Sequence, residues 1–159
     1  MLSLNLRSIL SLATVFSAAP MLAALANFEP LVLEQGFESA QVTGTTGGAI
    51  SLSTIANRDE EGNACVGYGD PENPDHILVL EDNFEQLTLE VNSRGGNTTL
   101  IVQGPDQTVR CAFGTSSDPD AILSDSQWKD GQYKVWVGSF EPGQYWNYRL
   151  SIQQDGISD

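Results

Sequence analysis

Short runs of alternating apolar and polar residues, separated by turns rich in Gly, Pro and Asn, dominate this sequence from residue 47 onward. The clearest run is Phe84 to Asn92, in which Leu87, Leu89 and Val91 share one face, as they do in a half-buried β-strand. The runs recur at intervals of roughly 8 to 15 residues, and helical periodicity is almost absent. This spacing predicts an all-β domain of seven to eight strands, arranged as an antiparallel sandwich or barrel.

The first residues are typical of a secretory signal. Arg7 gives a short positive region, Ile9 to Ala19 an apolar stretch, and Ala24-Leu25-Ala26 the small residues that a signal peptidase requires. We expect residues 1–26 to be cleaved, leaving Asn27 at the mature N-terminus. The alternative is an uncleaved anchor, but Pro20 leaves an apolar run shorter than the ~20 residues that span a bilayer. A secreted or periplasmic location, with no membrane insertion after cleavage, follows.

The remaining chain divides into an irregular lead-in at residues 27–46, a β-sandwich at 47–153 and a frayed tail at 154–159. The lead-in carries Pro30, Gly36 and Gly44, and a strand is expected from Ala49 to Ile55. The whole chain has 7 Lys and Arg against 21 Asp and Glu, a net charge of −14. This excess disfavours nucleic acid and anionic membrane surfaces as partners, because both would be repelled.

The sequence has two cysteines, Cys65 and Cys111. An even pair in an exported domain is most often oxidised, so we expect a disulfide that closes a loop of about 45 residues and stabilises the fold by about 4 kcal/mol. The alternative is a pair of buried free thiols.

Several strings resemble the bacterial pre-peptidase C-terminal domain family, in its short, stand-alone exported form. They are Pro74-Asp75-His76 before an apolar strand, Leu87 to Val91, Thr98 to Asp106 with its Gly-Pro-Asp turn, Gly131 to Phe140, and Tyr148 to Ile152. The resemblance implies a jelly-roll-like β-sandwich with an accessory role, and some members are associated with calcium or with substrate binding. The Asp pair that many short members place after the second cysteine is replaced here by Ala112 and Phe113.

Two acidic loops suggest a calcium site. Asn57, Asp59, Glu61 and Gly62 match the opening of a calcium-binding loop, although position 12 is Tyr68 rather than Glu. The expected ligands are Asn57, Asp59, Glu61, Asp118 and Asp120. The alternative is that both loops are simply solvated.

Trp136, Tyr145 and Trp146 form a predicted aromatic contact patch for a sugar or peptide. The alternative for Trp136 is packing beneath a loop or a second sheet. His76, the only histidine, precedes a buried strand and is expected to be packed and hydrogen-bonded rather than catalytic.

These features favour a non-catalytic extracytoplasmic binding or accessory module, stabilised by calcium in one version of the hypothesis. The partner would be a protein or a carbohydrate of the cell envelope. Two alternatives remain: a structural adaptor between proteins, and, more distantly, a glycoside hydrolase that uses paired carboxylates.

Overall fold

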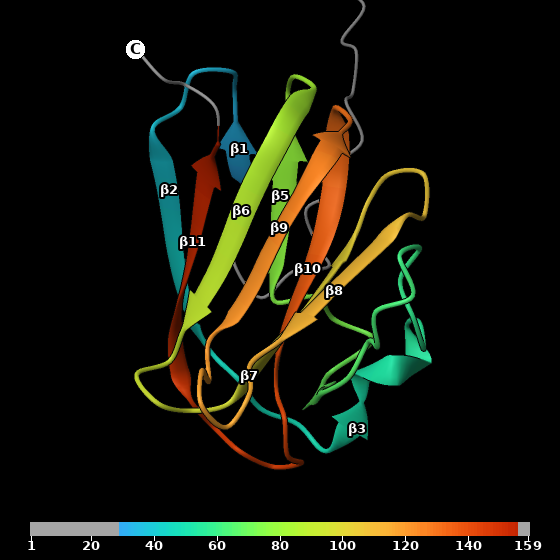
Figure 1. Cartoon of the computed structure of the whole chain (residues 1–159), viewed down its shortest axis with the longest axis vertical. Coiled ribbons are helices and arrows are strands. Elements are labelled where there is room, and N and C mark those ends of the chain that lie inside the picture. Colours follow the sequence, from blue (N-terminus) through green and yellow to red (C-terminus); the bar gives the residue numbers. More distant parts are fainter. Residues whose placement is uncertain (1–28, 156–159) are drawn as a thin grey trace, which may run out of the picture.

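In the computed structural model, which describes residues 29–155, two β-sheets pack face to face (Figure 1). The smaller sheet has the strand order β2-β11-β6-β9. Its strands are all antiparallel, and their bounds are β2 (Ser39–Thr45), β11 (Asn147–Gln154), β6 (Phe84–Asn92) and β9 (Ala121–Trp128).

The larger sheet has seven strands, with β10 (Gly131–Ser139) at its centre between β5 (His76–Leu80) and β7 (Thr98–Gln103). Its edges are formed by β8 (Val109–Phe113) on one side and by the short strands β1 (Leu31–Leu33), β3 (Ile50–Ser51) and β4 (Tyr68–Gly69) on the other. The predicted all-β sandwich is therefore confirmed. Of the eleven strands in the described part of the chain, eight have five or more residues, and only the pairing of β1 with β5 is parallel.

The main core fills the space between the sheets, because alternate residues of each long strand point inward. Buried side chains from β6, β7, β10 and β11 meet there, among them Leu89, Leu100, Val135 and Leu150. His76 on β5 and Tyr148 on β11 join the two sheets through a hydrogen bond of 2.8 Å between Nε2 and the phenol oxygen. The structural role expected for His76 is thus observed.

A second, smaller core lies on the outer face of the larger sheet. Ile101 and Trp136 point to that face and are covered by the segment that runs through the 3-10 helix η1 (Leu52–Thr54) to Cys65. The predicted disulfide between Cys65 and Cys111 is present, with Cα atoms 5.2 Å apart, and it fastens this cover to edge strand β8. Trp136 is consequently only 4% exposed, so its assignment to a contact patch was wrong.

Other sequence expectations also need correction. The stretch from Asn27 to Thr46, expected to be irregular, contains β1 and β2. Gly44 lies inside β2 because the Tyr148 ring packs over it: an added Cβ would lie 2.3 Å from the phenol oxygen. The expected strand from Ala49 to Ile55 is a two-residue strand followed by η1.

Strand β9 was not anticipated, because small Ala121 and charged Asp125 interrupt the apolar alternation that its buried Leu123 and Trp128 would otherwise show. The predicted signal at residues 1–26 and most of the predicted frayed tail lie outside the described residues. Gln154 still belongs to β11. Within residues 29–155, no helix is long and apolar enough to cross a membrane.

We predict that reducing the disulfide will loosen the cover over Trp136 as well as destabilise the fold. The cysteines are 46 residues apart. Closing a loop of this length lowers the entropy of the unfolded chain, which raises the free energy of unfolding by about 4 kcal/mol. Urea unfolding of the reduced and oxidised protein should show that loss, and native-state fluorescence should shift to the red as Trp136 meets water. An unchanged emission maximum in the reduced, folded protein would contradict the role of the disulfide as a fastener of the cover.

Candidate functional site

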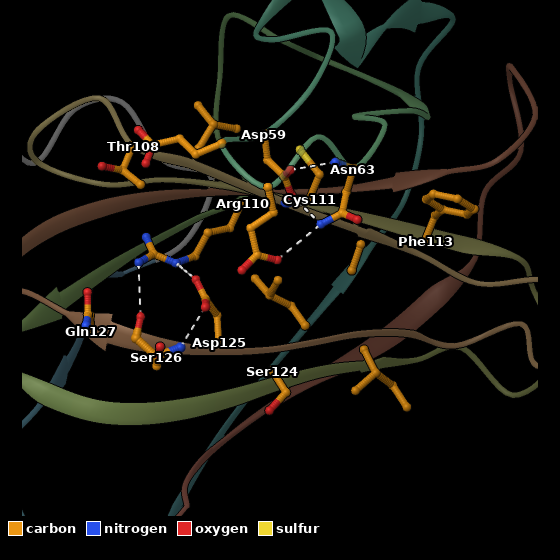
Figure 2. A pocket seen from close by; sticks show the side chains of 16 residues that line it. Asp59, Asn63, Thr108, Arg110, Cys111, Phe113, Ser124, Asp125, Ser126 and Gln127 are labelled. Carbon is orange, nitrogen blue, oxygen red and sulfur yellow. Dashed lines mark hydrogen bonds and ion pairs between the residues drawn. The ribbon is translucent and has the colours of Figure 1, made fainter.

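A groove of about 490 Å³ runs between the two edge strands β8 and β9 on one side of the sandwich (Figure 2). Its walls come from the loop around Asp59, from Thr108 to Phe113, and from Ile122 to Gln127. The predicted acidic loop around Asp59 meets the sandwich at this groove, so ionisable side chains from the loop and from both edge strands lie together there.

The positively charged side chain that lines this groove, Arg110, is already paired with an acidic residue. Arg110 of β8 forms an ion pair of 2.5 Å with Asp125 of β9 (Figure 2). Its guanidinium carbon lies 4.3 Å from the centre of the Trp128 ring. The Arg110 Nε makes the ion pair, and the Arg110 Nη2 donates to the carbonyl of Ser126 at 3.5 Å. The arginine therefore closes the open side of the sandwich by joining the two sheets.

The Asp59 carboxylate organises its own loop. One oxygen accepts from the backbone N–H of Asn63 at 2.7 Å, and the other accepts from the Asn63 amide at 3.0 Å and from the backbone N–H of Cys111 at 3.3 Å (Figure 2). The Asn63 amide also contacts Glu61, at 3.4 Å. Asn57 contributes its carbonyl to the N–H of Cys65 at 3.1 Å.

The second acidic loop has separate contacts. The Asp120 carboxylate accepts from the Asn92 amide at 2.7 Å and from the backbone N–H of Ser93 at 3.4 Å, while the carbonyl of Asp118 accepts from the N–H of Thr115 at 2.6 Å. Within residues 29–155, no group of three or more His, Cys, Asp or Glu side chains is arranged to hold a metal ion. The five-residue calcium site therefore stays a prediction.

The exposed aromatic side chains gather elsewhere, at the end of the sandwich where β8 and β10 finish and β11 begins. In the described part of the chain, the aromatic rings that are widely exposed are those of Tyr145 (71%), Phe140 (42%), Phe113 (41%) and Trp146 (37%). The rings of Phe113 and Phe140 are 6.2 Å apart. Phe140 and Trp146 line a small hollow, and Trp146 and Tyr145 line a larger one. We call these four residues the aromatic end.

The backbone of the aromatic end is held firmly in place. Buried Thr46, just after β2, donates its N–H to the carbonyl of Trp146 at 2.8 Å and accepts the N–H of Trp146 on its hydroxyl at 2.9 Å. The same hydroxyl donates to the carbonyl of Gln144 at 3.2 Å. Phe140 is tied to the neighbouring loop through a 2.9 Å bond from its N–H to the carbonyl of Asn97.

Glycines provide the seats for two of the rings. A Cβ added at Gly96 would lie 2.4 Å from the Trp146 indole, and one added at Gly47 would lie 2.4 Å from the Tyr145 ring. Each ring therefore rests on bare backbone and keeps part of its surface open to solvent. Rigid aromatic side chains of this kind bind partners at little cost in conformational entropy.

The sequence had indicated Tyr145 and Trp146 but not Phe113 or Phe140. Phe140 follows the buried Ser139 directly before the Glu-Pro-Gly turn, and Phe113 lies on an edge strand before Gly114. The sequence signal for both residues is a large aromatic side chain next to a turn. That signal does not distinguish an exposed ring from one that folds back onto the core.

A buried polar cluster lies between the sheets, near β5. Burial raises the pKa of Asp75 from 3.8 to about 6, although its carboxylate accepts the N–H of Val137 at 2.8 Å. Burial also lowers the pKa of His76 to about 4 and raises that of Tyr148, where the nearby Asp75 charge acts in the same direction. These groups are tied into the core rather than open to a ligand.

No family model matches the sequence, and no curated protein matches it. Among solved structures, the chain is similar to the pre-peptidase C-terminal domain of a collagenase from Bacillus anthracis, with a TM-score of 0.47 and 14% identity over 79% of this chain and 95% of that one. That structure is from the family whose strings the sequence resembles.

The chain is also similar to PliG of Aeromonas hydrophila, a periplasmic inhibitor of g-type lysozyme. The TM-score is 0.42, and the identity is 14% over 77% of this chain and 95% of that one.

The buried pair of Asp75 and His76 predicts opposing pH effects on stability. The folded state holds the Asp75 proton up to a higher pH than the unfolded state, so this group lowers stability as pH rises from about 4 to 6. His76 accepts a proton less readily when folded, so it lowers stability as pH falls from 6.5 to about 4. Asp75→Asn removes only the first effect and keeps an acceptor for Val137.

We therefore expect the stability of Asp75→Asn, relative to the unaltered protein, to rise by about 2 kcal/mol between pH 4 and pH 7. Urea unfolding at intervals of pH measures this difference. Two curves that stay parallel over the whole range would show that the Asp75 carboxyl does not titrate in the folded core as argued.

Proposed function

We propose that the chain is an exported, non-catalytic binding module that contacts its partner through the aromatic end. The observation that carries the proposal is the grouping of four exposed rings at one end of the sandwich, two of them seated on glycines, while the other tryptophans, Trp128 and Trp136, are buried. Leaving such apolar surface open to water is unfavourable unless a partner covers it. The disulfide supports an oxidising compartment outside the cytoplasm.

The chemistry of the other groups supports a binding role over catalysis. His76 is buried against Tyr148, and the Asp125 carboxylate is neutralised by Arg110. Asp59 accepts three hydrogen bonds from its own loop and from β8. These groups hold the fold together, so the surface left to meet a partner is the aromatic end.

Replacing either exposed ring should weaken binding to cell-envelope material. We expect Trp146→Ala and Tyr145→Ala each to reduce co-sedimentation with insoluble envelope polysaccharide about tenfold, because buried aromatic anchors carry much of the energy of an interface. Gly96→Ala should also weaken binding, because the added methyl group displaces the Trp146 ring without removing it.

Ile50→Ala provides the matched control, since Ile50 is 55% exposed on a short edge strand and lies outside the aromatic end. Its binding should equal that of the unaltered protein. Aromatic variants that fold and bind normally, or an Ile50→Ala variant that binds just as poorly as they do, would contradict the proposal.

A calcium-stabilised form of the module is the finer hypothesis. Calcium bound by the Asp59 loop should raise the melting temperature more than magnesium does at matched ionic strength, because magnesium demands a stricter octahedral geometry. Asp59→Asn should remove the calcium-specific part of the rise and leave the part due to screening. Equal shifts with the two ions would reject calcium stabilisation and leave the binding role untouched.

A further inference from the structure

A hollow of about 800 Å³ adjoins the aromatic end on the side of Tyr145 and Trp146. It lies where β2 and β11 pair near the loop that follows β6, so the sheet, the β6–β7 turn and the two rings together form its walls. Its polar lining includes Thr43, Thr45, Asn92, Asn147, Arg94 and Arg149.

The charge of this hollow is opposite to that of the whole protein. The chain carries 21 acidic residues, yet none lines the hollow, whereas two of its arginines do. Neither Arg94 nor Arg149 forms an ion pair with any residue between 29 and 155. By contrast, Arg110 is paired with Asp125, and Lys129 with Asp106.

Both arginines are fixed to this place by the backbone. Arg149 lies on β11 directly between Thr43 of β2 and Asn92 of β6 in the register of the sheet. Arg94 has a φ of +60°, a left-handed conformation that is uncommon for a residue with a side chain, and its N–H donates to Asn92 Oδ1 at 3.2 Å. A bulky cation in such a turn is a feature that often marks a functional position.

The remaining polar groups suit neutral hydroxyls. Thr45 donates to Asn147 Oδ1 at 2.8 Å, an arrangement that leaves the Asn147 amide nitrogen without a partner in the described part of the chain. Hydroxyl and amide groups beside flat aromatic faces match a sugar ring, which has polar edges and apolar C–H faces.

We propose that this hollow binds a carboxylate-bearing glycan, with Arg94 and Arg149 pairing with the acid group and Tyr145 and Trp146 stacking on the sugar rings. This inference rests on the proposed function and names its ligand class. Guanidinium groups bind carboxylates in a planar, bidentate geometry. A dense polyanion is disfavoured, because the net charge of the chain would repel it, whereas carboxylates spaced between neutral rings meet only the local positive hollow.

The test titrates the full chain with a tetramer in which glucuronic acid alternates with neutral N-acetylglucosamine, and with the methyl ester of the same tetramer. A change in tryptophan fluorescence on binding reports on Trp146, because Trp128 and Trp136 are buried and do not meet the ligand. We expect the acid to bind at least about tenfold more tightly than the ester, and Arg94→Gln and Arg149→Gln each to weaken acid binding about tenfold. Arg149→Lys should lose less, since it keeps the charge.

Lys134→Gln is the matched control, because it removes the same charge from a side chain that lines a different hollow, and it should bind the tetramer normally. Equal binding of acid and ester, arginine variants that bind normally, tighter binding of a tetraglutamate peptide, or no binding of the acid at about 1 mM would each overturn the inference. If Trp146→Ala still weakens binding to envelope polysaccharide about tenfold in any of these cases, the proposed function stands and only the ligand class fails.

Discussion

The pairing of β2 with β11 is the constraint on which the proposed binding surface depends. Seven residues of each strand are in register, from Ser39 opposite Gln153 to Thr45 opposite Asn147. The pairing places Thr46 beside Trp146, so that one buried threonine fixes the backbone that carries both exposed rings. It also places Thr43 beside Arg149. Because these contacts join residues about 100 positions apart, the surface exists only once the whole sandwich has formed.

Whether an aromatic residue is core or contact surface depends on what covers it. Trp136 points away from the main core, yet it is buried because the disulfide holds the segment from Leu52 to Cys65 over it. Trp146 rests on Gly96 and has no such cover. The arginines follow the same principle. Arg110 is ion-paired with Asp125 between the sheets, whereas Arg94 and Arg149 line an open hollow.

The two-sheet fold and the disulfide could be predicted from the sequence, because period-2 patterns such as that of β6 and an even cysteine count in an exported chain are local signals. Gly44 wrongly favoured an irregular segment. It lies inside β2 because the Tyr148 ring packs over it, and the local sequence does not show that contact. Trp136 could not be assigned, because its burial depends on a covalent cover distant in sequence. The arginine hollow was equally hidden, since Arg94 and Arg149 are 55 positions apart and meet only through strand pairing.

The most direct test of the central claim is an amide chemical-shift map of the ¹⁵N-labelled protein, recorded as soluble envelope polysaccharide is added. We predict that the largest shifts fall at the aromatic end, around Phe113, Phe140, Tyr145 and Trp146. Shifts centred instead on the groove between β8 and β9, around Asp59 and Arg110, would place the contact surface on the side of the sandwich and contradict the account.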